Sequence, residues 1–395
     1  MTAYLNALGI LCALGKGKSD VAANLFAGQS AGMQTRAGWI ADKPVMVGEV
    51  QAALPTLDDA LAAQRTRNNR LLLAAAREIE SDILAAVSRH GADRIGIVLG
   101  TSTSGIAEAG ESIATYVTSG THAAEYDYGQ QELNAPAHFL ARHLGLTGPS
   151  YVISTACTSS ARALLTARRL LNAGLCDAVL CGGVDSLCRL TLNGFHALEA
   201  VSATRCNPFS AQRQGINIGE GAALFLMSRE PAGDASIALL GAAANSDAYH
   251  ISAPDPQGRG AEAVMRAALR DAGMTAGHID YLNLHGTATQ HNDAMESLAV
   301  SAVFPDGVPS SSTKPLTGHT LGAAGALEAA FCWLTLSAFN PDRLLPPHRW
   351  DGQPDPSLPR LRLVQPGTQA TPGVAMSNSF AFGGSNVSLI LGVTP

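Results

Sequence analysis

The sequence predicts an α/β fold, and three observations support this class. Short apolar runs rich in β-branched residues alternate with alanine-rich stretches along all 395 residues. Apolar residues make up 46% of the chain and charged residues only 15%, so a large interior can be buried. The 40 glycines gather in short runs such as GEGAA, GAAGA and FGG, which favours tight turns and close backbone packing. Strands that alternate with helices of this length form sheets covered by helices.

The expected strands are short apolar runs bounded by turn residues. They are 94–100, 149–155, 177–183, 222–228, 236–241, 279–285, 373–379 and 386–392. Between them lie segments with helical periodicity, namely 68–81, 160–173, 261–272 and 322–338.

One pattern of strand, sharp turn and helix occurs twice. The first copy, 151–171, has Cys157 at its turn, and the second, 308–334, has His319 there. The repeat predicts an internal duplication, although sequence identity between the copies is weak. We expect two halves, 1–235 with the nucleophile and 236–395 with two histidines.

Composition excludes several classes of function. A net charge of −6 argues against a nucleic-acid-binding face. The N-terminus has no basic segment before its apolar run, and no stretch of about 18 apolar residues occurs, so neither a signal peptide nor a membrane span is expected. The absence of GxGxxG and GxxxxGK[ST] patterns gives no support for phosphate binding. The seven cysteines contain no CxxC pair, so neither disulfides nor a zinc site is expected, and a reducing cytoplasm fits best. These cysteines are residues 12, 157, 176, 181, 188, 206 and 332.

Cys157 follows an apolar strand and precedes a helix-forming run. A side chain at such an elbow is held at the end of a sheet with helix amides behind it. The positive helix N-terminus favours the thiolate, so Cys157 is a candidate nucleophile. The alternative is a small buried hydrophobe, the usual environment of a lone cysteine.

Two histidines and an ion pair lie in the second half. His285 ends an expected strand and is followed by glycine, so it is placed to project into a crevice. His319 lies between Lys314 and Glu328 in a segment rich in alanine and glycine. A buried lysine and glutamate are unfavourable unless they pair, so they indicate a polar site. Metal binding is an alternative for these side chains, but no HExxH spacing occurs.

Taken together, these motifs resemble those of β-ketoacyl-acyl-carrier-protein synthases, in the same order. They are STACTSS around Cys157, HGTAT around His285, TKPLTGHTLGAAGALEA around His319, and NSFAFGGSN near the C-terminus, with GEGA at 219–222 and SDAYHISAP at 246–254. The resemblance runs from about Leu8 to the C-terminus. Two histidines are typical of the elongating synthase I and II group, because synthase III would have asparagine in place of His319.

The resemblance implies a thiolase-like fold, with two halves packed as α/β/α/β/α layers in a dimer. It implies that Cys157 accepts the acyl group as a thioester, and that His285 and His319 stabilise the enolate formed when malonyl-ACP loses CO2. Lys314 and Glu328 would order the region around His319. The backbone amides of Cys157 and Phe382 would form the oxyanion hole, with Phe382 also gating the site. Substrate contacts would come from Thr287, Thr289 and Phe380.

The resemblance also implies an acidic acyl carrier protein as partner. Substrates would arrive on its phosphopantetheine arm, and no other cofactor is expected. Arg65, Arg67, Arg70 and Arg205 are candidate carrier contacts, against the alternative of a solvated helix face.

Three positions depart from the usual pattern of that family. Ala381 stands where glycine is usual, which predicts a stiffer loop around Phe382. The segment 206–222 differs from RPFDxxRDGFxxGEGA at several positions. Thr103 is near a position that sets acyl-pocket depth in relatives, and a polar residue there suits an unusual acyl chain.

The leading prediction is an elongating ketosynthase that acts as an acyltransferase on a fatty-acyl chain. Alternatives are a dedicated aryl-polyene or polyketide ketosynthase and a non-catalytic chain-length factor that pairs with an active ketosynthase. Chain-length factors have generally lost the catalytic cysteine, which is present here as Cys157. A thiolase acting on CoA thioesters would normally have a second cysteine in the second half. Both a homodimer and a heterodimer with a chain-length-factor-like subunit remain open.

Overall fold

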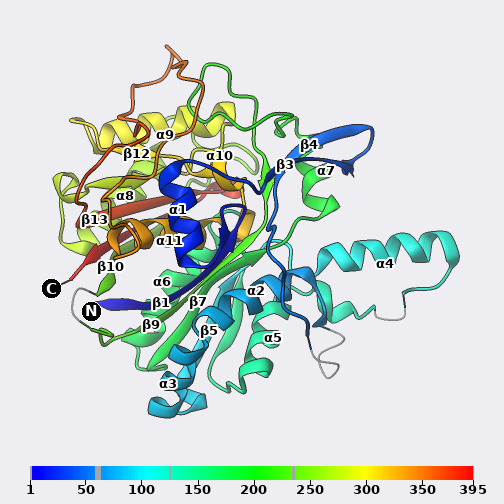
Figure 1. Ribbon diagram of the computed structural model, residues 1–395. Coiled ribbons are helices and arrows are strands. Elements are labelled where there is room, and N and C mark those ends of the chain that lie inside the picture. The colour runs from blue at the N-terminus through cyan, green and yellow to red at the C-terminus, as the bar shows by residue number, and fades with distance from the viewer. Residues whose placement is uncertain (1, 58–63, 124–125, 234–235, 395) are drawn as a thin grey trace.

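The apolar runs form the strands of one mixed sheet of 11 strands. The computed structural model describes residues 2–57, 64–123, 126–233 and 236–394 (Figure 1). Its elements in chain order are β1 (Ala3–Cys12), β2 (Gly15–Lys16), α1 (Lys18–Ala27), β3 (Met33–Ile40), β4 (Lys43–Gly48), α2 (Arg67–Glu78), α3 (Glu80–His90), η2 (Ala92–Arg94), β5 (Ile95–Gly100), α4 (Ile106–Ser119), η3 (Tyr128–Gln131), α5 (Ala135–Leu144), β6 (Ser150–Ile153), α6 (Ser159–Asn172), β7 (Ala178–Asp185), α7 (Arg189–Ala197), β8 (Ile218–Gly219), β9 (Gly221–Ser228), β10 (Ile237–Ser246), α8 (Arg259–Ala272), η4 (Ala276–His278), β11 (Tyr281–Asn283), α9 (Gln290–Val303), β12 (Ser310–Ser311), α10 (Lys314–Thr317), η5 (Leu321–Ala323), α11 (Ala324–Leu336), β13 (Val374–Phe380), η6 (Phe382–Gly384) and β14 (Ser385–Val393).

The sheet contains the same strand arrangement twice. Its order is β12-β11-β13-β14-β10-β1-β9-β7-β5-β6, with β2 paired to β1. In each half two parallel pairings are followed by two antiparallel ones, so β6-β5-β7-β9-β1 corresponds to β12-β11-β13-β14-β10. The halves join where β1 pairs antiparallel with β10. This shared topology supports the predicted duplication, although residues 234–235, at the predicted junction, lie outside the described residues.

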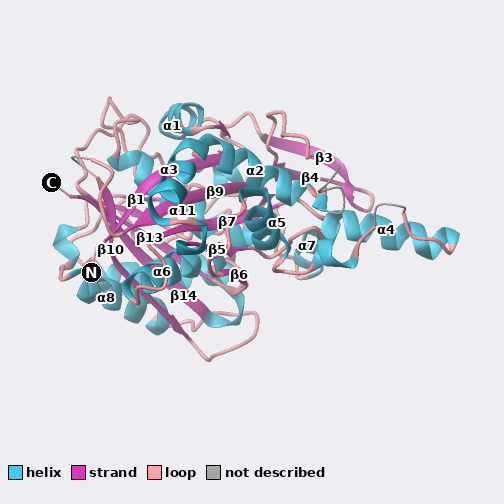
Figure 2. Ribbon diagram, turned by 90° about the horizontal axis from the view of Figure 1, so that it is seen from below, coloured by secondary structure: helices cyan, strands magenta, loops and turns pink. Residues whose placement is uncertain are grey.

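Helices cover both faces of the sheet, as the expected five layers require (Figure 2). Helix α8 packs on the second half of the sheet, and α9 packs against α8 within the hydrophobic cluster that covers β11 and β13, while α2 and α5 pack on the first half. Between the two halves lie α6 and α11, which touch each other and strands of both halves. These are the helices that follow Cys157 and His319, so the duplicated pattern of strand, turn and helix lies at the centre of the molecule.

Small side chains allow α6 and α11 to approach closely. A Cβ on Gly325 would lie 2.7 Å from Cβ of Ala161, so a larger residue would separate the helices. Nearly every residue of α11 is buried, including Phe331 and Leu334. A helix that is apolar on all sides belongs in an interior layer.

The strands and helices expected from the sequence are confirmed, with bounds that shift by a few residues. The expected helix at 68–81 is two helices, α2 and α3, which meet at Ile79. The elements that were not predicted include β1, the small sheet β3-β4-β8, and α4, which projects from the body of the molecule (Figures 1 and 2). None of the helices in the described part of the chain is both long and apolar enough to cross a bilayer.

Candidate active site

Cys157 lies at a strained elbow between β6 and α6. The preceding residue, Ala156, has φ of 51°, a left-handed conformation that non-glycine residues rarely adopt. Such strain persists where the surrounding structure imposes it, and it gathers at functional sites. Cys157 is buried and lines a cavity.

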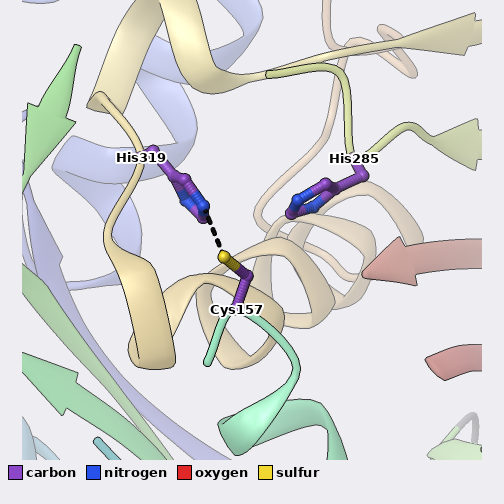
Figure 3. Close-up of side chains that lie close together, drawn as sticks. All are labelled: Cys157, His285 and His319. Atoms are coloured by element: carbon purple, nitrogen blue, oxygen red, sulfur yellow. Dashed lines mark hydrogen bonds between the residues drawn. The ribbon is translucent and has the colours of Figure 1, made fainter. Parts of the chain in front are cut away.

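His319 lies on the corresponding turn of the second half. Its amide donates to the carbonyl of Asn217 at 2.6 Å, and its carbonyl accepts from the amide of Gly219 at 2.9 Å. Gly318 and Leu321 on either side have φ of 69° and 50°. These contacts hold the imidazole so that Nε2 lies 2.9 Å from Sγ of Cys157 (Figure 3).

His285 follows β11 and completes the cluster. Its ring points toward the same sulfur (Figure 3) and lies 5.3 Å from that of His319 in an edge-to-face arrangement. The carboxylate of Glu296 accepts the amides of His285 and Gly286 at 2.8 and 2.7 Å. The turn that carries this histidine is therefore anchored on α9.

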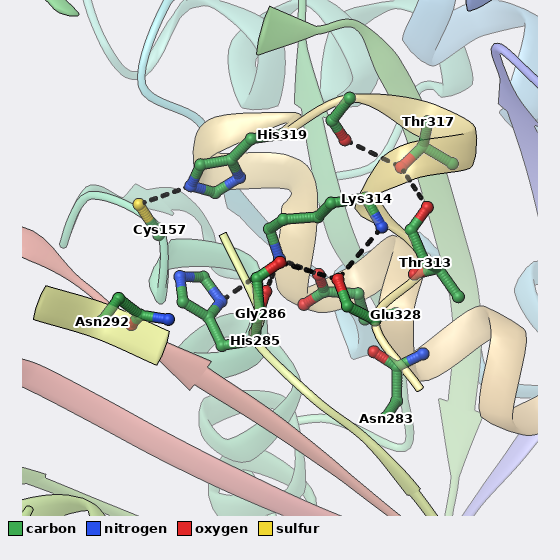
Figure 4. A network of polar contacts seen from close by, with 12 residues as sticks. Cys157, Asn283, His285, Gly286, Asn292, Thr313, Lys314, Thr317, His319 and Glu328 are labelled. Carbon is green, nitrogen blue, oxygen red and sulfur yellow. Dashed lines mark hydrogen bonds and ion pairs between the residues drawn. The ribbon is translucent and has the colours of Figure 1, made fainter. Parts of the chain in front are cut away.

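Lys314 holds His285 from behind (Figure 4). Its ammonium group donates to Glu328, to the carbonyl of His285 and, at 3.3 Å, to Nδ1 of His285. A lysine ammonium only donates, so Nδ1 of His285 must accept and its proton is on Nε2. The buried ion pair, expected from the sequence, thus presents an N–H of His285 to the cavity.

Burial keeps the three reactive groups neutral. It raises the pKa of the Cys157 thiol to about 12 and, together with the charge of Lys314, holds the pKa values of His285 and His319 well below 6.5. The free cysteine is therefore a thiol beside a neutral imidazole, whereas the position of Cys157 before α6 had predicted a thiolate. Nδ1 of His319 has no hydrogen-bond partner among the described residues, so nothing in this part of the chain fixes the tautomer of that ring.

The three residues line a cavity of about 490 Å³. Thr287 and Thr289 also line it, with their hydroxyl groups 2.9 Å apart. Two aromatic residues of the C-terminal segment form another part of the wall. The ring centroids of Phe380 and His285 lie 6.1 Å apart. Phe382 is 38% exposed and packs against Phe195, with 5.6 Å between the ring centroids.

The predicted role of Thr103 is not supported by this cavity. Thr103 is buried and is not among the described residues that line the cavity. Its hydroxyl donates to Asp185 at 2.7 Å, because the loop after β5 turns inward toward the end of β7.

The candidate carrier contacts have partners inside the chain. Arg67 forms an ion pair with the buried Glu220, so the geometry supports a structural role. Arg70 donates to the carbonyl of Pro55 at 3.0 Å, and Arg205 to that of Pro315 at 2.6 Å. A carrier contact stays a prediction for Arg65, Arg67, Arg70 and Arg205.

Sequence reasoning missed several residues around the site. Glu296 lies on the same helix as Asp293, and its position 11 residues after His285 was the only local signal. Phe195 and Asp185 come from elements far away in sequence, so no spacing pattern could place them.

The same cluster could also offer ligands to a metal ion. One ligand atom each from Cys157, His285 and His319 lie within 4.8 Å of one another. A dication would have to displace the thiol proton and would face the ammonium group of Lys314 behind His285. The donor set therefore fits acyl transfer better than metal binding.

Comparisons with known proteins agree with this geometry. The chain matches the family "Beta-ketoacyl synthase, N-terminal domain" over residues 7–232 and "Beta-ketoacyl synthase, C-terminal domain" over residues 237–348. It is 32% identical to nodulation protein E of Rhizobium meliloti, over 98% of this chain and 97% of that protein. It is 30% identical to 3-oxoacyl-[acyl-carrier-protein] synthase 2 of Synechocystis sp., over 87% and 86%.

Solved structures show the same fold along the whole chain. A ketosynthase (ApeO) from Xenorhabdus doucetiae, solved in complex with its chain length factor (ApeC), is 48% identical at a TM-score of 0.94, over 100% of this chain and 98% of that one. A beta-ketoacyl synthase from Burkholderia phymatum is 26% identical at a TM-score of 0.88, over 100% of both chains. The fold is thus the expected thiolase-like α/β fold, and the chain belongs to the β-ketoacyl synthase family of condensing acyltransferases.

Proposed function

We propose that Cys157, His285 and His319 carry out a decarboxylative condensation of malonyl-ACP with an acyl group held on Cys157. The observation that carries this proposal is the convergence of one thiol and two neutral imidazoles on one cavity. A thiol supplies the nucleophile for acyl transfer, and neutral N–H donors can stabilise an enolate without a strong base.

In the first half-reaction, Sγ of Cys157 attacks the thioester carbonyl of acyl-ACP. The thiol proton passes to Nε2 of His319, 2.9 Å away, and then to the departing phosphopantetheine thiolate. The bond from Sγ to the carbonyl carbon forms first and gives a tetrahedral oxyanion, and the carbon–sulfur bond to the carrier then breaks. Backbone amides of Cys157 and Phe382 would bind the oxyanion.

In the second half-reaction, malonyl-ACP loses CO2 and the electron pair moves into its thioester carbonyl. Nε2–H of His285, whose tautomer is set by Lys314, donates to that oxygen. His319 can donate alongside, because its tautomer is free to change once the thiol proton has left. The carbanion then attacks the acyl thioester of Cys157, whose thiolate is released and takes up a proton from water.

The substrates would be carried on the phosphopantetheine arm of an acyl carrier protein, without another cofactor. Thr287 and Thr289 place two hydroxyl groups on the cavity wall, where they can hydrogen-bond the amides of that arm. All seven cysteines are free and buried, which favours a reducing compartment, so we propose the cytoplasm as the location.

We propose a polyene- or polyketide-type chain as substrate and a chain-length-factor-like subunit as partner. The 48% identical ketosynthase was solved with its chain length factor, and a 26% identical one is described as the ishigamide ketosynthase/chain length factor. An exposed apolar surface that a partner could cover lies on and near the projecting helix α4, and it includes Ile113, Tyr116, Val117, Tyr128 and Leu133. Val117 is 78% exposed, and a group of exposed apolar side chains of this kind is typical of an interaction surface.

The alternative, that this chain is itself the non-catalytic factor, is less well supported. Such a factor needs no nucleophile, whereas here Cys157 is held within hydrogen-bond distance of His319.

The proposal is tested by intact-protein mass after incubation with a panel of acyl-ACPs, with Cys157→Ala as control. We expect one acyl adduct on the wild type and none on the variant. Absence of an adduct with every donor, both for the chain alone and with a co-purified partner, would support the factor instead.

A further inference from the structure

Asp185 is a buried carboxylate for which the proposed mechanism has no role. It ends β7 and is 0% exposed. Its oxygens accept five hydrogen bonds from uncharged groups, and burial raises its pKa. A buried carboxylate is costly, so its contacts must be satisfied and they restrict what surrounds it.

One oxygen, Oδ1, binds the loop that follows β5. It accepts from the hydroxyl groups of Thr101 and Thr103, both at 2.7 Å, and from the amides of Ser102 and Thr103, both at 2.8 Å. Just before this loop, a Cβ on Gly100 would lie 2.2 Å from the amide nitrogen of Ser160. This end of β5 therefore rests directly on the first turn of α6, behind Cys157.

The other oxygen, Oδ2, binds the segment that carries His319. It accepts the amide of Ala323 at 3.0 Å, four residues after the histidine. Ala323 is the N-cap of α11 and offers no side-chain cap of its own. Near it, the hydroxyl of Ser160 accepts the amide of Ala326 at 2.8 Å. Two side chains of the first half thus bind amides at the start of α11. The amide of Ala323 is shared between Asp185 and the carbonyl of Thr320, also at 3.0 Å, whereas that of Ala326 is one of the helix-start amides that the helix itself leaves without a partner.

The contact between the two halves is tight at this point. A Cβ on Gly322 would lie 2.7 Å from the carbonyl carbon of Thr101 and 2.9 Å from Oδ2 of Asp185. The neighbouring Leu321 has φ of 50°, a conformation that its surroundings must impose. Any displacement of Ala323 is therefore passed on through a short, strained turn to His319.

We propose that Asp185, assisted by Ser160, is a positioning residue that sets the distance between His319 and Cys157. It acts through Ala323 and touches neither reactive group. The inference rests on the proposed role of His319 in condensation. A displacement of about 1 Å can cost about 100-fold in rate, so a loosened turn impairs the step that needs His319.

The test uses Asp185→Asn, which preserves shape but not hydrogen bonding. In either orientation its NH2 group faces a donor, either the amide of Ala323 or the donors at 101–103. Thr101→Val is the matched control, because it removes one partner of Asp185 and leaves the contact with Ala323 intact. Wild type and His319→Ala are measured in parallel, each for acylation of Cys157 by mass and for condensation with malonyl-ACP by kcat and KM.

We expect Asp185→Asn to lower kcat for condensation about 100-fold and, because His319 also accepts the thiol proton, to slow acylation as His319→Ala does, with KM within about 3-fold of wild type. Thr101→Val should condense within about 3-fold of wild type. The proposal is overturned if Asp185→Asn condenses normally, or if both half-reactions fall equally in it and in the control. If His319→Ala condenses normally, the proposed role of His319 is wrong and the positioning role falls with it. Normal condensation by Asp185→Asn beside an inactive His319→Ala refutes the positioning role alone.

If Asp185→Asn does not fold, Ser160→Ala tests the positioning role instead. It removes the second inter-half cap with a small change in volume. Condensation should fall at least about 5-fold while the adduct on Cys157 still forms, and a wild-type condensation rate would refute the proposal.

Discussion

Nε2 of His319 lies 2.9 Å from Sγ of Cys157, although 162 positions separate the two residues. Each side chain stands on the turn between a strand and a buried helix, and those two helices, α6 and α11, pack against each other. The duplicated elbow therefore brings the nucleophile of one half to the imidazole of the other.

Replacing Lys314 alone should destabilise the fold. Lys314→Met leaves the buried carboxylate of Glu328 without its cation, which typically costs about 3–5 kcal/mol. The double variant Lys314→Met with Glu328→Leu removes both charges and should recover most of that loss. Denaturant unfolding measures both. Equal destabilisation in the single and double variants would show that the ion pair is not the source of the effect.

On acidification, kcat for condensation should begin to fall only well below pH 6.5. Burial and Lys314 lower the pKa of both His285 and His319, so the neutral donors persist on acidification. In the Lys314→Met, Glu328→Leu double variant the repelling cation is gone, the histidine pKa values rise, and the residual kcat should begin to fall at a higher pH. Profiles of kcat against pH for both proteins check this, and an unmoved acid limb would contradict it.

Glu296 should make the fold less stable as pH rises. Burial raises its pKa from 4.5 to about 8, so between these values the folded protein binds a proton that the unfolded chain has lost. The free energy of unfolding should therefore fall by about 1–3 kcal/mol between about pH 6 and about pH 8. Glu296→Gln should flatten this dependence, and the surface variant Glu262→Gln should not. A wild-type slope in Glu296→Gln would exclude this carboxyl as the cause.

Arg67 should matter for stability more than for carrier binding. Its partner Glu220 is fully buried, so Arg67→Met leaves a carboxylate unpaired at a cost of about 1–3 kcal/mol. Arg70→Met is the comparison, because the guanidinium of Arg70 donates to the backbone carbonyls of Pro55 and Leu54. We expect Arg67→Met to unfold at lower denaturant concentration with an unchanged KM for acyl-ACP. A raised KM with unchanged stability would instead favour the carrier contact.

Much of the fold was predictable because its signals are local. Apolar runs between turn residues located most strands of the large sheet, and the elbow at Cys157 follows from a strand that ends just before a helix. The family motifs also placed His285 and His319 in one site, where the structure brings them together.

Contacts between distant segments were not predictable from these patterns. From the sequence, Arg67 is a charged residue at the start of an expected helix, but its partner Glu220 lies 153 positions away. Thr103 bonds to Asp185, 82 positions away, and leaves the cavity wall to other residues. The neutral state of the Cys157 thiol was unpredictable for the same reason, because the burial of this residue depends on elements of both halves.

The most direct test of the account is condensation by His319→Ala compared with its acylation. Substrate acyl-ACP and malonyl-ACP are supplied, and the adduct on Cys157 and the β-ketoacyl-ACP product are measured separately. We expect the adduct to form more slowly than in wild type, and kcat for condensation to fall by about 100- to 1,000-fold, as for loss of one oxyanion donor. Normal product formation by this variant would contradict the assignment of the site.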